Sequence, residues 1–269
     1  MIQFMCFNIH SLNYICRPMA HRYFIKLSYD GTPFHGWQIQ KNAKSIQQCL
    51  NEALSTVLRT DIYTVGCGRT DTGVHAKKFY AHFEIESELT EVSDIVFRVN
   101  CILPKEIAVS HIFSVESNVH TRFTATSRTY EYLISHSKDP FSVKRTFKYR
   151  ESLDIENMNR AAELMLNYKD FTSFSKLHSD AETNFCDIHH SLWEVQPMGL
   201  RFEIKANRFL RNMVRAIVGT MIELGRGKIS LEDFTEIIEA KDRGKAGFSV
   251  PAQGLYLIDI SYPKDSGVL

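Results

Sequence analysis

No run of apolar residues in the 269-residue chain approaches the length of a membrane-spanning helix. The six cysteines show no paired spacing, which is typical of a reduced, cytoplasmic protein rather than one held by disulfides. The net charge at pH 7 is only +1, so the total charge does not indicate a nucleic-acid partner. Only local clusters of basic residues can do so. These absences leave a cytoplasmic globular protein, without a membrane partner, that is long enough for two ordinary domains.

The glycine-rich stretch GCGRTDTGVHA, which begins at Gly66, lacks the pattern of a nucleotide-binding loop. A dinucleotide fingerprint needs glycine at its first, third and sixth positions. Gly66 and Gly68 fit, but Asp71 takes the sixth position, where a carboxylate would repel a pyrophosphate. A P-loop fails as well, because Ile229 stands where serine or threonine should follow Gly227 and its lysine. The aspartate therefore needs another explanation.

Hydrophobic periodicity predicts the order strand-helix-strand-strand-helix-strand twice. Strands are expected near residues 22–29, 62–67, 79–86, 107–116, 128–136, 190–197, 199–207 and 254–262, and helices near 45–58, 90–101, 154–167, 208–224 and 230–240. This order predicts an α+β fold of two ferredoxin-like (split βαβ) halves, with largely antiparallel sheets and an active-site cleft between them. The expected domains are 21–118 and 119–269, after an N-terminal extension, 1–20, of open role.

Arg69 and Asp71 are the first candidate site residues. In an extended chain, residues two apart point the same way, so the guanidinium and the carboxylate would share a face. A carboxylate kept ionised by a neighbouring cation suits a nucleophile or a general base. A surface ion pair in a turn explains the same residues equally simply and stays open.

Three arginines form a second candidate group. Arg208, Arg211 and Arg215 have the spacing i, i+3, i+7, which places them on one face of a predicted helix, with no acidic residue nearby to pair with them. Such a row could follow a phosphate backbone. A solvated basic face on an amphipathic helix is the alternative.

The segment 120–150 combines basic residues with interleaved aromatic ones. Arg128 and Tyr130 lie two apart on a predicted strand, and a basic and an aromatic side chain on one sheet face can hold and stack an unpaired base. Tyr132 shares that face, so either tyrosine could instead belong to the core.

No metal site is expected. His178, Cys186, His189 and His190 include possible ligands, but their spacing matches no standard zinc pattern. Adjacent residues on a strand, such as His189 and His190, also point to opposite faces.

Six blocks in order along the chain resemble the bacterial tRNA pseudouridine synthase A family. They read YDGTPFHGWQIQ, GRTDTGVHA, RFTATSRTYEYLI, DFTSFSK, FLRNMVRAIVG and KAGFSVPAQGLYL. The resemblance implies that Asp71 is the catalytic aspartate, that Tyr130 stacks on the target uracil, and that Arg69 and Arg215 lie near both. The departures are mild: Thr72 replaces a usual alanine, and Lys-Phe replaces a frequent Gly-Gln just after the motif.

The same resemblance implies an isomerase that converts uridine to pseudouridine on the 3′ side of the tRNA anticodon arm, at tRNA positions 38, 39 and 40. It implies a homodimer in which one tRNA bridges both subunits. Arg208, Arg211 and Arg128 are expected on the RNA backbone, and no cofactor is expected because the reaction exchanges no electrons. Two other classes stay open. A non-catalytic RNA-binding protein would form no product, and a hydrolase using Asp71 with a second acid would release ribose.

Overall fold

The computed structural model describes residues 20–176 and 183–268 of the chain. The N-terminal extension expected before the first strand therefore lies outside the described residues, except for Ala20. His178 of the rejected metal group lies outside them too.

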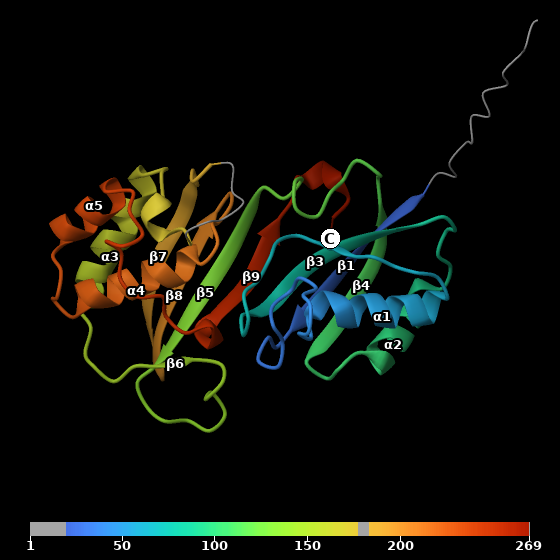
Figure 1. Cartoon of the computed structure of the whole chain (residues 1–269), viewed down its shortest axis with the longest axis horizontal. Helices are drawn as coiled ribbons and strands as arrows, with labels where there is room; N and C mark the ends of the chain where they lie inside the picture. Colours follow the sequence, from blue (N-terminus) through green and yellow to red (C-terminus); the bar gives the residue numbers. More distant parts are fainter. Residues whose placement is uncertain (1–19, 177–182, 269) are drawn as a thin grey trace, which may run out of the picture.

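The order of elements follows the predicted order along the chain (Figure 1). The strands are β1 (His21–Tyr29), β2 (Val65–Gly66), β3 (His75–Ile85), β4 (Ile107–Val115), β5 (Ser127–Ser135), β6 (Phe147–Lys148), β7 (Ile188–Gln196), β8 (Gly199–Ala206) and β9 (Leu255–Ser261). The helices are α1 (Ile46–Leu58), α2 (Val92–Ile102), α3 (Ile155–Leu164), α4 (Met213–Gly225) and α5 (Leu231–Glu239).

One mostly antiparallel sheet runs through the molecule in the order β4-β1-β3-β9-β5-β8-β7. The two-residue strand β2 pairs with β3, and β6 pairs with β5. The last strand, β9, joins the two halves: it runs antiparallel to β5 and makes a short parallel pairing with β3, in which His75 faces Tyr256 and Ala76 faces Leu257. Helices α1 and α2 lie with β1, β3 and β4, while α3, α4 and α5 lie with β5, β7 and β8 (Figure 1).

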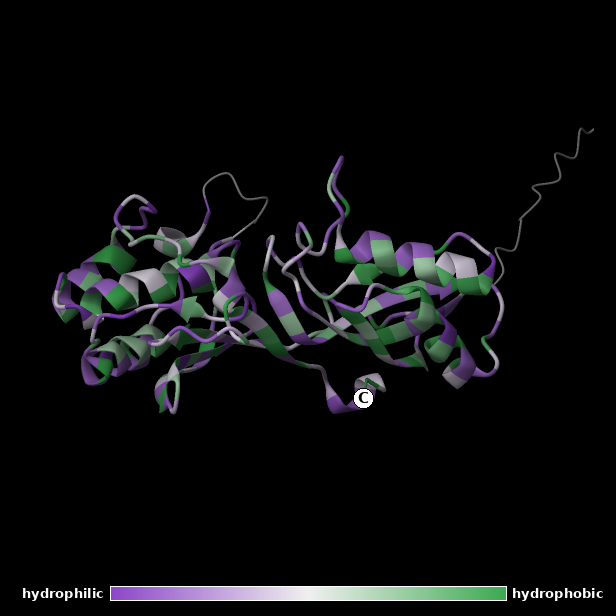
Figure 2. Ribbon diagram, turned by 90° about the horizontal axis from the view of Figure 1, so that it is seen from below, coloured by the Kyte–Doolittle hydropathy of each residue, from purple (hydrophilic) through white to green (hydrophobic). Residues whose placement is uncertain are grey.

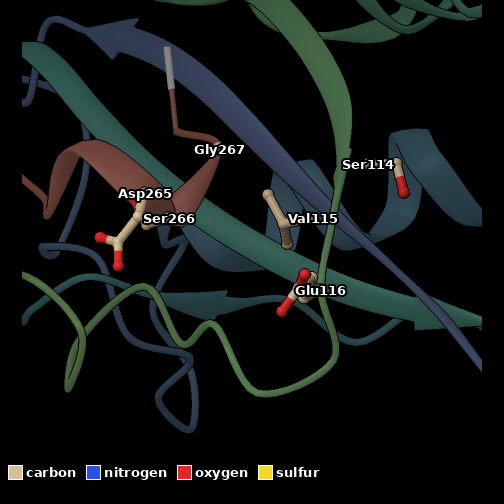
Figure 3. A pocket seen from close by; sticks show the side chains of 6 residues that line it. All are labelled: Ser114, Val115, Glu116, Asp265, Ser266 and Gly267. Carbon is tan, nitrogen blue, oxygen red and sulfur yellow. The ribbon is translucent and has the colours of Figure 1, made fainter.

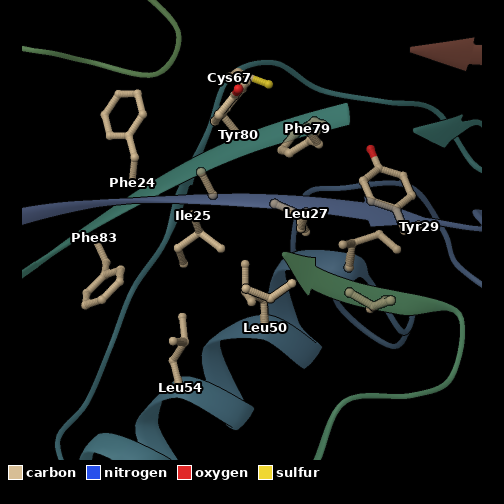
Figure 4. Close-up of a cluster of buried hydrophobic side chains, with 14 of the residues drawn as sticks. Phe24, Ile25, Leu27, Tyr29, Leu50, Leu54, Cys67, Phe79, Tyr80 and Phe83 are labelled. Carbon is tan, nitrogen blue, oxygen red and sulfur yellow. The ribbon is translucent and has the colours of Figure 1, made fainter. Parts of the chain in front are cut away.

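Helix α1 shows how local sequence builds these layers. Ser45 has extended backbone angles and its hydroxyl accepts a hydrogen bond from the Gln48 amide, as an N-cap does. The side chain of Gln48 bonds Glu52 instead of returning to the backbone of Ser45, so only one of the two bonds of a capping box is formed. Leu50 and Leu54 point from the helix toward β1 (Figure 4).

Among the described residues, the core has two clusters of buried side chains, one mainly from β1, β3 and α1 and the other mainly from β8, α3 and α4. Figure 4 shows the first, in which Phe83 of β3 lies on the side of β1 that faces α1, and Phe24 of β1 lies on the opposite side. Hydrophobic and hydrophilic residues alternate along the strands and stripe the helices (Figure 2). Tyr130 of β5 packs against both clusters, so it stands at the junction of the halves.

The predicted start of the arginine-bearing helix is wrong. α4 begins at Met213, not Arg208, because Asn212 adopts a left-handed conformation (φ 66°) that α-helical residues do not adopt. The Asn212 side chain donates to Ser249 Oγ at 2.6 Å, which holds this irregular start in place. Arg208 and Arg211 therefore precede the helix, and the three arginines do not form a row on one helical face.

Among the described helices, none is both long and apolar enough to cross a membrane.

Candidate active site

The loop that follows β2 carries Asp71. Its start is fixed to β3, since the Cys67 amide donates to the Tyr80 carbonyl at 2.8 Å. A turn then begins at Asp71, whose carbonyl accepts from the Val74 amide at 3.1 Å, and Gly73 supplies the positive φ of 78° that the turn requires. The aspartate thus lies on a tightly held turn between two strands.

A second loop, between β1 and α1, packs directly against this turn. The Trp37 amide donates to the Thr70 carbonyl at 3.2 Å. Gly36 has φ +84°, and a Cβ added there would lie 2.3 Å from the Thr70 carbonyl oxygen. The two backbones approach so closely that position 36 requires glycine. This accounts for Gly36 in the block YDGTPFHGW, which precedes the helix. On the other side, the Tyr29 hydroxyl lies 2.9 Å from Thr70 Oγ1, a buried contact that sequence reasoning missed.

Asp71 faces two arginines from the other half of the chain. Arg215 Nη1 lies 3.5 Å from Asp71 Oδ2, and Arg211 Nε lies 4.0 Å from Asp71 Oδ1. The Asp71 side chain is 32% exposed, so it is reachable from solvent yet enclosed on most sides. Arg69 is exposed on the same loop. Asp71 and Arg215 are 144 residues apart in sequence, so their ion pair joins two distant segments. It differs from the local Arg69–Asp71 surface pair that the sequence left open as an alternative.

The segment that precedes β9 holds Arg215 in position. Arg215 Nε donates to the Val250 carbonyl at 2.7 Å, and the Val250 amide donates back to the Arg215 carbonyl at 3.2 Å. Gly219, one turn later on α4, lies so close to this segment that a Cβ would meet the Phe248 carbonyl oxygen at 1.8 Å. The sequence block KAGFSVPAQG thus holds the Arg215 side chain in place. Its residue types alone could not reveal this role.

The structure separates the two tyrosines of β5. Tyr132 is fully buried and its hydroxyl donates to the Pro251 carbonyl at 2.8 Å, so it is the core residue. Tyr130 is only partly buried, and its ring meets that of Phe209 edge-on, with centroids 5.1 Å apart. Burial raises the Tyr130 pKa well above its usual range, with a smaller contribution from the charge of Asp71, so its hydroxyl stays neutral.

Arg128 ties several loops together around this site. Its guanidinium donates to four backbone carbonyls: Ala125 at 3.0 Å, Asn207 at 2.9 Å, Cys67 at 3.3 Å and Arg122 at 2.5 Å. A guanidinium with these partners has little capacity left for the RNA backbone contact expected of Arg128.

The other predicted backbone contacts lie nearer the surface. Arg208 donates to Thr183 Oγ1 at 3.2 Å in an exposed hydrogen bond. Arg211 is 59% exposed even though its Nε lies beside Asp71. Both guanidinium groups can therefore be reached by a large anionic ligand.

Asp71 does not line either of two surface hollows formed by other described residues. One, of about 280 Å³, is lined by Tyr29, His75 and Tyr256 where β3 meets β9, with Arg145 at its edge. The other, of about 380 Å³, lies between the end of β4 and the C-terminal residues Asp265 to Gly267 (Figure 3). Within residues 20–176 and 183–268, no group of three His, Cys, Asp or Glu side chains could hold a metal ion.

Comparison with known proteins gives the family. A family model described as tRNA pseudouridine synthase matches residues 161–263. The tRNA pseudouridine synthase A of Bacteroides thetaiotaomicron is 50% identical over 247 residues, covering 91% of each chain. That of Bacteroides fragilis is 49% identical over 91% of this chain and 98% of its own, and that of a Thermoanaerobacter species 37% identical over 88% and 98%.

This chain belongs to the tRNA pseudouridine synthase family. The resemblance found in the six sequence blocks is thereby confirmed over most of the chain. The residues matched by the family model include Arg215 but not Asp71, which lies upstream of them.

Proposed function

We propose that the chain isomerises uridine to pseudouridine on the 3′ side of the tRNA anticodon arm, with Asp71 as the catalytic carboxylate. The observation that carries the proposal is the meeting of Asp71 from one half with Arg215 from the other, 3.5 Å apart. Tyr130 lies near enough for its pKa to respond to the Asp71 charge. A carboxylate, a cation and an aromatic ring thus surround one point, and family membership supplies tRNA as the substrate.

The chemistry of the reaction matches these groups. Pseudouridine formation breaks the bond between uracil N1 and ribose C1′ and forms one between C5 and C1′, while C5 loses a proton and N1 gains one. Electrons balance within the substrate, so the reaction itself demands no cofactor. A carboxylate can serve as a nucleophile toward sugar or base, or as a base toward a sugar proton. Arg215 and Arg211 stabilise the position and charge of that carboxylate.

Tyr130 has the role of stacking on the target uracil in this proposal. The uridine must leave its stack, at a cost of a few kcal/mol, and stacking on an aromatic ring returns ~1–3 kcal/mol. A neutral tyrosine hydroxyl also adds no negative charge beside Asp71. Arg69 is assigned to the flipped nucleotide, and Arg208 and Arg211 to backbone phosphates.

We assign the fold as two ferredoxin-like halves, residues 21–118 and 119–269, with the site between them. It rests on strand order: β4-β1-β3-β2 in the first half and β9-β5-β8-β7 in the second. When the two-residue strand β6 is left out and the strands are numbered within each half, both orders read 4-1-3-2. The equal orders support a duplicated module, and the parallel β3–β9 pairing joins the two copies.

The proposal includes a homodimer in which one tRNA contacts both subunits, and its support is the family resemblance. Sedimentation of the purified protein with and without tRNA would measure the stoichiometry. A complex of one subunit and one tRNA would contradict the homodimer but would leave the proposed activity unaffected.

The activity itself is tested by carbodiimide mapping of pseudouridine in bulk tRNA before and after incubation with the purified protein. New stops on the 3′ side of the anticodon arm are the expected result. Stops elsewhere would change the substrate assignment, and unchanged tRNA together with normal binding would favour a non-catalytic RNA-binding protein.

A further inference from the structure

Phe123 is an exposed aromatic residue held in a fixed place beside the catalytic loop. It lies in the link between the halves, and 75% of its surface is accessible. Single exposed hydrophobic residues are common, so exposure alone means little. Its ring, however, rests on that of His120, with centroids 4.5 Å apart, and the Arg122 guanidinium lies 5.4 Å from its centre. His82 supports His120 from beneath at 4.6 Å.

The backbone around Phe123 is bonded to the strand and loop that lead to Asp71. Thr121 is fully buried, and its hydroxyl donates to the Val65 carbonyl of β2 at 3.0 Å. The Arg128 guanidinium donates to the carbonyls of Arg122 and Cys67 together. Cys67 and Asp71 are four positions apart along the chain, a reach of at most about 14 Å. These bonds fix the backbone of Phe123 in place relative to the loop that carries Asp71. An exposed side chain on a loop without such bonds would have no fixed position.

We propose that Phe123 and Arg122 form a platform for an unpaired base of the tRNA next to the target uridine. The inference rests on the proposed function. When one nucleotide leaves the stack, its neighbour loses a stacking partner, and an exposed aromatic face can replace it. Arg122, exposed beside the ring, supplies the positive charge that the adjoining phosphate needs. The fixed arrangement means that little side-chain freedom is lost on binding.

A fluorescent anticodon stem-loop RNA tests the platform. Two RNAs carry 2-aminopurine on the 5′ or the 3′ side of the target uridine, since stacking on an aromatic ring quenches this base. With one of them, the unsubstituted protein should quench the fluorescence, and Phe123→Ala should restore it. Affinity should fall on the order of 5- to 150-fold, because a stacked base contributes ~1–3 kcal/mol and 1.4 kcal/mol is tenfold. Phe123→Tyr keeps the aromatic face and should keep both signals.

The matched control is Phe141→Ala, which removes a phenylalanine that is 89% exposed on a different loop and should change neither signal. If Phe123→Ala does not fold, Phe123→Leu takes its place with the same expectation. No quenching by the unsubstituted protein, or equal quenching by the alanine or leucine variant, overturns the platform. Tritium release from uridine C5 by the unsubstituted protein reports the proposed function separately, so the two failures are distinguishable.

Discussion

At the scale of single residues, the sequence indicated Asp71 as a candidate site residue but not the contacts that hold its surroundings in place. The motif supplied a carboxylate in a glycine-rich loop, and the family resemblance added Arg215 and Tyr130. The contacts that hold these groups could not be read from the sequence, because they link segments far apart in it. Arg215 depends on Val250, and Thr70 on Tyr29. Residue type and spacing carry no information on such long-range backbone contacts.

Replacing Asp71 tests the catalytic assignment. Asp71→Asn keeps the shape of the side chain but removes the charge that attracts Arg215 and Arg211. We expect pseudouridine formation to be abolished while tRNA binding persists, because binding depends mainly on phosphate contacts. Tritium release from uridine C5 measures turnover and filter binding measures affinity. Turnover near the normal rate in the variant would remove Asp71 from the mechanism.

Replacing Tyr130 tests the stacking role. Tyr130→Phe keeps an aromatic face and should keep most affinity, whereas Tyr130→Leu should still bind tRNA but turn over on the order of 10- to 100-fold more slowly, from a stacking contribution of ~1–3 kcal/mol. Tyr132→Leu is the contrasting core change on the same strand face, and it should lower Tm. A Tyr130→Leu protein that is destabilised but fully active would mean that Tyr130 is a packing residue.

At the scale of elements, the sequence predicted which segments are strands and helices better than where one decisive helix begins. Apolar periodicity locates α4, since Val214, Ile217 and Met221 are all buried. It gave no sign that the helix starts at Met213, because that start depends on Asn212 bonding to Ser249 across the fold. The arginine row was therefore wrong as a helical face, although Arg211 and Arg215 still meet at Asp71.

This irregular segment predicts different effects for its two arginines. Arg208→Ala should weaken binding to all tRNAs and flatten the salt dependence by about one unit of slope per lost phosphate contact, with little change in turnover at saturation. Arg211→Ala should also slow turnover, since its guanidinium lies beside Asp71. Arg160→Ala on α3 is the control, an exposed arginine paired with Glu156 on the same helix. If the salt dependence of tRNA binding in these variants equals that of Arg160→Ala, then Arg208 and Arg211 do not contact phosphates.

At the scale of the whole molecule, the predicted order of strands and helices along the chain was found, but the joining of all strands in one sheet was not foreseen. β9 can pair with both β3 and β5 only once the chain has folded, so no local signal reveals it. The buried carboxylate of Glu131 adds a charged link across this junction. Its Oε1 lies 2.5 Å from Lys77 Nζ of β3, and its Oε2 accepts from Arg201 Nε of β8 at 2.9 Å. The halves are thus held in one relative position, which a site shared between them requires.

A buried histidine of β3, His82, which packs against His120 of the link between the halves, also makes the stability of the fold depend on pH. His82 is 4% exposed, and burial, together with the charges of His120 and Arg22, lowers its pKa to about 4. In the unfolded chain the same histidine titrates near its ordinary value of ~6.5, so the unfolded state binds more protons between the two values. Stability from this group is therefore complete above about pH 6.5 and is lost as pH falls toward 4, by at most roughly 1.4 kcal/mol per pH unit.

Urea unfolding of the protein at a series of pH values between 4 and 7 measures this dependence. We expect the free energy of unfolding to fall on acidification in the unsubstituted protein, and the fall to be shallower in His82→Gln, whose side chain does not titrate. His111→Gln, which replaces an exposed histidine on β4, is the matched control and should retain the full slope. Because His82 supports His120 and, through it, Phe123, acidification should also weaken quenching of the 2-aminopurine RNA before the protein unfolds. Parallel slopes for the unsubstituted protein and His82→Gln would place the acid sensitivity elsewhere in the fold.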